Sequence, residues 1–174
     1  MILVTGGSGS GKSEWAEKCA MEAANGGKLY YLATMNNEGE EASRRIKRHR
    51  DLRLGKGFDT IEEGMDVSRV LQRAGSSDTV LLEDLSNLLA NLRYSAGLEF
   101  SDSEKIILRG IEKLSDGVRE LVIVSNDIFA DGYEYPSETE EYMKTLARLN
   151  IGFAASSHTV VEVVAGISIY HKRK

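Results

Sequence analysis

A glycine-rich segment near the N-terminus constrains the fold of this chain more than any other feature. Residues 6–13 read Gly-Gly-Ser-Gly-Ser-Gly-Lys-Ser, which fits the pattern Gly-x-x-x-x-Gly-Lys-Ser/Thr. The apolar run Ile2–Thr5 predicts a buried strand before it, and the run from Lys12 to about Ala24 predicts a helix after it. Glycines at such a junction let backbone N–H groups turn toward a phosphate, and the helix N-terminus adds partial positive charge. The segment therefore predicts a phosphate-binding loop, or P-loop.

The residues of this loop have separate expected roles. We expect nucleotide contacts from all of them, namely Gly6, Gly7, Ser8, Gly9, Ser10, Gly11, Lys12 and Ser13. Lys12 is expected to reach the β- and γ-phosphates and to be catalytic, while the Ser13 hydroxyl is expected to bind Mg²⁺. The loop thus predicts binding of a nucleoside triphosphate together with Mg²⁺.

A P-loop also needs a carboxylate at the end of a neighbouring strand to hold Mg²⁺. The predicted strand over residues 79–82 is followed directly by Glu83 and Asp84. Asp84 also suits the position before a helix, where its carboxylate would accept a backbone N–H. We therefore predict that Glu83 binds the metal and nucleotide, with Asp84 as the alternative.

Strands and helices alternate along the chain. The remaining predicted strands cover residues 28–34 and 121–125, and a final strand or hairpin covers 159–170. The remaining predicted helices cover residues 40–53, 66–74, 85–94, 103–114 and 137–156. The last of these helices is predicted to begin with a capping box formed by Ser137 and Glu140. Alternation of this kind predicts a mostly parallel sheet with helices on both faces, whose ligands lie at the carboxyl ends of the strands. We predict one α/β domain of the P-loop NTPase type over residues 1–174.

Composition limits the classes of partner. The net charge of −5 argues against a general nucleic-acid binder, and the single cysteine, Cys19, excludes a disulfide within the chain. No stretch approaches the ~18 apolar residues that a membrane helix needs, and the N-terminus lacks a basic leader. We expect a cytoplasmic protein with no nucleic-acid or membrane partner.

One basic run stands out against this acidic background. Residues 44–53 carry seven basic groups in ten positions, His49 included. The run could form a solvated helix face, a nucleic-acid patch, or a helix that brings cations and one nucleophile to a polyphosphate. The acidic chain disfavours the second interpretation. A neutral imidazole can attack phosphorus near neutral pH, so His49 is a candidate nucleophile, and a surface histidine is the alternative.

Several segments together form a longer pattern. They are the P-loop region 2–13; Tyr31-Leu32-Ala33-Thr34; Glu41, Arg45-Ile46, His49 and Arg53; Glu62; Leu81-Leu82-Glu83 with Asn91; Val124-Ser125-Asn126-Asp127; Asn150; and Gly166-Ile167. In this order they resemble the bifunctional adenosylcobinamide kinase and adenosylcobinamide-phosphate guanylyltransferase family of cobalamin assembly. The resemblance spans nearly the whole chain.

This resemblance implies two reactions. A nucleoside triphosphate first phosphorylates the hydroxyl of the aminopropanol arm of adenosylcobinamide. His49, as the catalytic nucleophile, then attacks the α-phosphate of GTP and passes GMP to the substrate phosphate, which gives adenosylcobinamide-GDP. The resemblance further implies ATP and GTP as substrates, a corrinoid acceptor and a homotrimer. It adds nucleotide contacts from Ala33, Thr34, Arg50, Asp51, Arg53 and Glu62.

The chain departs from the family pattern mainly in residues 127–151. The family has a glycine-rich loop where residues 128–136 are more acidic, an Arg-Asp pair where the next helix has Glu140-Glu141, and Asn-Gln where Asn150-Ile151 stands. Phe58 also replaces a family tryptophan. These changes concern the acceptor more than the nucleotide. They leave two alternatives: a related P-loop enzyme with a changed acceptor or one activity, and a nucleotide-binding protein without turnover. Whether ATP or GTP donates the phosphate stays open.

Overall fold

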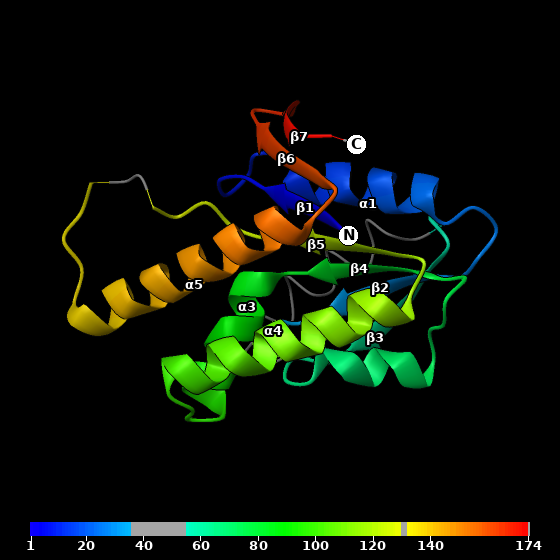
Figure 1. The fold of residues 1–174 in the computed structure, drawn as a ribbon. Coiled ribbons are helices and arrows are strands. Elements are labelled where there is room, and N and C mark those ends of the chain that lie inside the picture. The colour runs from blue at the N-terminus through cyan, green and yellow to red at the C-terminus, as the bar shows by residue number, and fades with distance from the viewer. Residues whose placement is uncertain (36–54, 130–131, 174) are drawn as a thin grey trace.

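The computed structural model describes residues 1–35, 55–129 and 132–173, and it contains one seven-stranded sheet (Figure 1). The strands are β1 (Ile2–Thr5), β2 (Leu29–Ala33), β3 (Phe58–Glu62), β4 (Thr79–Glu83), β5 (Glu120–Val124), β6 (Thr159–Val164) and β7 (Ile167–Lys172). Their order across the sheet is β3-β2-β4-β5-β1-β6-β7. Only β7 pairs antiparallel to its neighbour within this described sheet, so the predicted mostly parallel α/β fold is confirmed.

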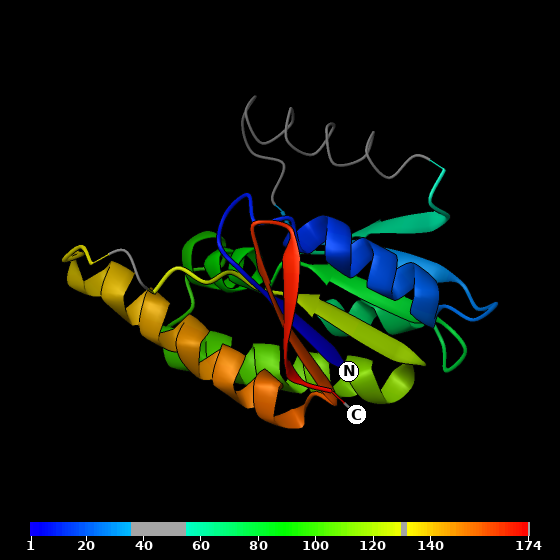
Figure 2. The same cartoon turned by 90° about the horizontal axis from the view of Figure 1, so that it is seen from above.

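Helices cover both faces of the sheet, as predicted (Figures 1 and 2). One face carries α1 (Lys12–Ala23), and the other carries η1 (Val67–Gln72), α3 (Leu85–Ala90), η2 (Asn91–Ser95), α4 (Phe100–Gly117) and α5 (Ser137–Ser156). The small side chains of Ala16 and Ala20 are fully buried, which lets α1 lie close against the strands at the centre of the sheet. This packing places the N-terminus of α1 at the carboxyl end of the sheet.

The opposite face holds the larger core. Helix α4 buries Ile107, Ile111 and Leu114, whose spacing of four and three residues forms a single apolar stripe. These side chains belong to one cluster with Leu82 of β4 and Ile123 of β5, both fully buried. Two apolar layers therefore fix the sheet between helices. In the part of the chain that the structure describes, no helix combines the length and apolarity needed to cross a membrane.

Three details differ from the predicted elements. Strand β3 was not predicted; it lies at the sheet edge, its residues are half-buried or exposed, and its sequence Phe-Asp-Thr-Ile-Glu lacks a continuous apolar run. The predicted capping box is wrong, because Ser137 is already the first helical residue, Pro136 precedes it, and no side-chain hydrogen bond from the described residues caps α5. The predicted helix 85–94 is α3 followed by the π-helical turn η2. The predicted helix 40–53 lies outside the described residues.

Candidate nucleotide-binding site

The phosphate loop connects β1 to α1, as the motif predicts. Gly11 has φ 91° and immediately precedes α1, and this left-handed conformation favours glycine. A Cβ atom on Gly6 would lie only 2.5 Å from the carbonyl oxygen of Val163, so no larger residue fits there. Lys12 is 8% exposed, and its Nζ donates a hydrogen bond of 3.1 Å to the carbonyl oxygen of Gly7. The side chain of Lys12 therefore folds back over the phosphate loop.

The structure joins the loop to the predicted metal residue. The Ser13 hydroxyl donates a hydrogen bond of 2.7 Å to Oε1 of Glu83, which ends strand β4. We expected this acid on a strand next to β1, but β5 lies between β1 and β4. The prediction that β4 is the direct neighbour of β1 is therefore wrong. The expected meeting of the two side chains is nevertheless found, because the start of α1 extends across the carboxyl end of the sheet.

Glu83 has an environment that suits a cation. Its Oε2 atom is buried with no hydrogen-bond partner among the described residues. Burial, and next the charge of Asp84, raise the pKa of Glu83 to about 7, against the lowering effects of Ser13 and Lys12. An unsatisfied buried carboxylate oxygen beside a hydroxyl fits a hard cation such as Mg²⁺, which commonly takes few protein ligands and several phosphate or water oxygens. Correspondingly, no group of three or more acidic, histidine or cysteine side chains in the described ranges could hold a metal alone.

Asp84 is the helix cap that the sequence predicts. Its Oδ1 atom accepts hydrogen bonds of 2.7 Å from the backbone N–H of Asn87 and from the Ser86 hydroxyl. Its Oδ2 atom accepts a bond of 3.0 Å from the side-chain amide of Asn126, which follows β5. Both carboxylate oxygens of Asp84 are therefore occupied, while one oxygen of Glu83 is not. This difference favours Glu83 as the metal residue.

Glu83→Gln is expected to raise the Mg²⁺ concentration required for half-maximal turnover and to flatten the pH dependence of Mg²⁺–nucleotide binding. Because the pKa of Glu83 is raised from 4.5 to about 7, the unliganded fold retains a proton that the unfolded chain releases above pH 4.5. That group therefore lowers stability progressively from about pH 4.5 to 7, and metal binding must displace its proton. Titrations of Mg²⁺ at pH 6 and 8 measure both effects. An unchanged Mg²⁺ requirement, with Asp84→Asn impaired instead, would transfer the role to Asp84.

Three further predicted residues lie at the carboxyl ends of the strands, on the same side of the sheet as Glu83. Ala33 is in register with Glu62 of β3 on one side and with Glu83 of β4 on the other. Thr34 is fully buried, and its hydroxyl lies 3.0 and 2.8 Å from the carbonyl oxygens of Glu83 and Asp84. Thr34 thus fastens the end of β2 to the end of β4. Nucleotide contact by Ala33, Thr34 and Glu62 stays a prediction, and His49, Arg50, Asp51 and Arg53 lie outside the described residues.

Glu17 is a residue near the site that the sequence motifs did not indicate. This residue lies one helical turn after Ser13, is 6% exposed and forms an ion pair of 2.5 Å with Lys56. Its charge also contributes to the raised pKa of Glu83. The spacing of four residues from Ser13 could have indicated that both side chains lie on the same side of α1. Its pairing with Lys56 depends on tertiary structure and had no signal in the sequence.

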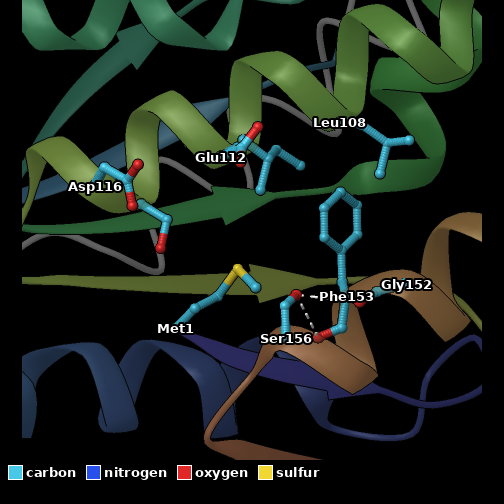
Figure 3. A pocket seen from close by; sticks show the side chains of 9 residues that line it. Met1, Leu108, Glu112, Asp116, Gly152, Phe153 and Ser156 are labelled. Atoms are coloured by element: carbon cyan, nitrogen blue, oxygen red, sulfur yellow. Dashed lines mark hydrogen bonds between the residues drawn. The ribbon is translucent and has the colours of Figure 1, made fainter.

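A cavity of about 450 Å³ lies elsewhere in the molecule (Figure 3). It opens between α4 and α5 beside Met1, and its lining includes Leu108, Glu112 and Phe153. Met1 precedes β1, so this cavity is at the amino end of the strand whose carboxyl end carries the phosphate loop. The cavity is therefore separate from the candidate nucleotide site.

Solved structures share this fold. The flagellar accessory protein FlaH from Methanocaldococcus jannaschii aligns with a TM-score of 0.50 and 13% identity, over 99% of this chain and 78% of that chain. The KaiC-like protein PH0186 from Pyrococcus horikoshii OT3 aligns with a TM-score of 0.51 and 14% identity, over the same shares. At this identity the comparison supports the fold alone, which agrees with the predicted P-loop NTPase architecture.

Sequence relatives carry more specific information. The bifunctional adenosylcobalamin biosynthesis protein CobU of Escherichia coli K12 is 28% identical over 97% of this chain and 98% of its own length. The corresponding CobP protein of Pseudomonas aeruginosa is 29% identical over 95% of this chain and 93% of its length. The family description "cobinamide kinase / cobinamide phosphate guanyltransferase" matches residues 2–170. With the phosphate loop and the Ser13–Glu83 pair in place, the chain belongs to the cobinamide kinase / cobinamide phosphate guanyltransferase family.

Proposed function

We propose that this chain phosphorylates adenosylcobinamide with a nucleoside triphosphate and then transfers GMP from GTP, through guanylylated His49, to give adenosylcobinamide-GDP. The observation that carries the proposal is the complete phosphate loop joined to Glu83 by Ser13, in a chain of this family. The bifunctional relatives support both halves of the reaction. The experiment that tests it is analysis of the products formed from adenosylcobinamide, ATP and GTP.

The kinase half depends on the P-loop. The acceptor hydroxyl attacks the γ-phosphorus and loses its proton to solvent, while the bond to the oxygen bridging the β- and γ-phosphates breaks and the nucleoside diphosphate leaves. Lys12 and the loop N–H groups bind the β- and γ-phosphates and stabilise the charge that develops as this bond breaks. Ser13 and Glu83 are the residues that would hold Mg²⁺, which neutralises phosphate charge when bound. Because burial raises the pKa of Glu83, metal binding there must displace a proton and is favoured as the pH rises.

The guanylyl-transfer half depends on His49. A neutral imidazole nitrogen attacks the α-phosphorus of GTP, a nitrogen–phosphorus bond forms, and pyrophosphate leaves. An oxygen of the cobinamide phosphate then attacks the same phosphorus and releases the histidine. The basic run 44–53 supplies cations for the charge on the departing pyrophosphate, and cations near an imidazole also favour its neutral form.

The segment between β5 and α5 is proposed to contact the acceptor. The backbone N–H of Asp127 donates a hydrogen bond of 3.0 Å to the carbonyl oxygen of Gly6, so this segment begins at the phosphate loop. Its described residues, 127–129 and 132–136, form neither helix nor strand. Phe129 and Tyr133 expose 39% and 77% of their surface. Exposed aromatic side chains on a segment that begins at the phosphate loop suit a large, flat acceptor such as a corrinoid.

Replacing residues 127–136 with the glycine-rich loop typical of the family is expected to change the KM for the acceptor by several-fold and the KM for nucleotide much less. The reason is that the P-loop and Glu83 stay intact, while the proposed acceptor surface is exchanged. Steady-state kinetics with each substrate varied in turn measures both constants. Equal changes in the two constants, or no change in either, would count against an acceptor role for this segment.

A second candidate function is a related enzyme with another acceptor or with only one of the two activities. The observation that favours it is the altered composition of residues 127–151, where acidic residues stand in place of family positions. Failure of adenosylcobinamide to accept phosphate, with GTP still bound, would favour this alternative. We also propose a homotrimer, which mass measurement by light scattering tests directly.

A further inference from the structure

The hairpin of β6 and β7 contacts the backbone of the phosphate loop. The backbone N–H of Gly166, at the hairpin turn, donates a hydrogen bond of 2.8 Å to the carbonyl oxygen of Ser10. Figure 2 shows the tip of this hairpin beside the loop that joins β1 to α1. The two segments are separated by more than 150 positions in the sequence, so this contact is a feature of the tertiary structure.

The turn has a defined geometry. Val164 pairs with Ile167, which leaves Ala165 and Gly166 as a two-residue turn. Their φ angles are 51° and 80°, and two positive values are the mark of the tight turn that matches the twist of a β-hairpin. A Cβ atom on Gly166 would meet nothing within 4 Å, so glycine is favoured there by backbone conformation and not by space. The hairpin thus presents the Gly166 N–H at a fixed position.

Two glycines of the loop are fitted closely to this hairpin. A Cβ atom on Gly11 would lie 3.4 Å from the Cα of Gly166, and one on Gly6 would lie 2.5 Å from the carbonyl oxygen of Val163. Both positions also have positive φ angles, 91° for Gly11 and 157° for Gly6. The hairpin therefore packs directly against the phosphate loop, and glycines at positions 6 and 11 let the two backbones approach closely.

The hydrogen bond to Ser10 orients the next backbone N–H group. A trans peptide unit is planar, and its C=O and N–H point in opposite directions. When Gly166 holds the Ser10 carbonyl toward the hairpin, the N–H of Gly11 points away from the hairpin. Backbone N–H groups exposed in this way on a loop are the groups that bind an anion. Without this bond the Ser10 carbonyl could turn inward, where its partial negative charge would repel phosphate.

We propose that the Ala165–Gly166 turn sets the anion-binding conformation of the phosphate loop, with Gly166 as a positioning residue that acts through Ser10. The proposal rests on the nucleotide binding within the proposed function, and it extends that function to a second element of the fold. The hairpin itself need not touch the nucleotide. Its effect is on the orientation of loop N–H groups, so it should concern the phosphates and not the base.

The test compares two changes in the turn. Insertion of one glycine between Ala165 and Gly166 displaces the N–H donor, whereas Ala165→Asn keeps a two-residue turn of positive φ and serves as the matched control. Calorimetry with GTP and with inorganic pyrophosphate measures affinity, and the Tm without ligand reports the fold. We expect the insertion to lower the affinity for both ligands about ten-fold, which is the effect expected from losing one hydrogen bond. The control variant should bind both ligands as tightly as the parent does.

Parent-like affinity in a folded insertion variant would overturn the proposal. If the insertion variant does not fold, replacing the Gly166 amide by an ester removes only the N–H group, and the same ten-fold loss is expected from it. Parent-like affinity in the ester variant would equally overturn the proposal. If the parent protein binds pyrophosphate but makes no adenosylcobinamide product, the proposed function is wrong. The role of the turn is then still decided by the pyrophosphate affinities of the parent and the insertion variant.

Discussion

Lys12→Ala is expected to abolish kinase turnover and to weaken nucleoside triphosphate binding by about ten- to a hundred-fold, the range for a lost hydrogen bond to a charged group. Lys12 is the only basic residue of the loop, and its side chain is almost completely buried at the start of α1. Its Nζ atom bonds to the carbonyl oxygen of Gly7, an arrangement that a phosphate oxygen can replace with a stronger, charge-assisted bond. Calorimetric titration with GTP measures the loss.

The matched control for this variant is Lys18→Ala. Lys18 lies on the same helix but is exposed, so its removal should leave GTP affinity within about two-fold, as expected for a surface charge. The Tm of both variants should stay close to that of the parent. If Lys12→Ala binds GTP as tightly as the parent, the assigned role of this lysine is wrong.

His49→Ala is expected to eliminate guanylyl transfer while phosphorylation of adenosylcobinamide continues. Incubation of the parent with GTP and Mg²⁺ should add one GMP to a ring nitrogen of His49, and the variant should show no added mass. A phosphoramidate is labile to acid and stable to base, so its hydrolysis distinguishes it from a serine ester. Loss of one activity alone identifies a nucleophile, since a residue that only supports the fold would reduce both activities.

The two other histidines provide controls for this prediction. His158 lies 3.0 Å from a carboxylate oxygen of Glu120, and His171 lies 2.8 Å from one of Glu162. A histidine held by a carboxylate in this way is not free to attack a phosphorus without losing that contact. His158→Ala and His171→Ala should therefore keep the GMP adduct. An adduct that survives His49→Ala, or that maps to either of these residues, would contradict the assignment.

The sequence was sufficient to predict the elements of the core but not their neighbours. Strands such as β1, β4 and β5 are short apolar runs between turn residues, which is the pattern of buried parallel strands. The position of β5 between β1 and β4 has no local signal, because it depends on how the crossover helices pack on the two faces of the sheet. The edge strand β3 was missed since it is paired on one side only and has little apolar sequence.

The candidate site shows the same division. Lys12, Ser13 and Glu83 could be predicted because a P-loop requires those residue types at fixed places relative to a strand and a helix. The hydrogen bonds of Asn126 to Asp84 and of Gly166 to Ser10 could not, because they join residues that are distant in sequence. Such contacts carry no periodicity, and they arise only when the strands are brought into one sheet.

Analysis of the products that the parent protein forms from adenosylcobinamide, ATP, GTP and Mg²⁺ tests the proposed pair of reactions. Liquid chromatography with mass detection should show adenosylcobinamide phosphate first and adenosylcobinamide-GDP afterwards, with omission of GTP blocking the second product. His49→Ala should accumulate the phosphate alone, and Lys12→Ala should leave the acceptor unchanged. Absence of both products, in a protein that still binds GTP, would mean that this chain does not catalyse the proposed reactions.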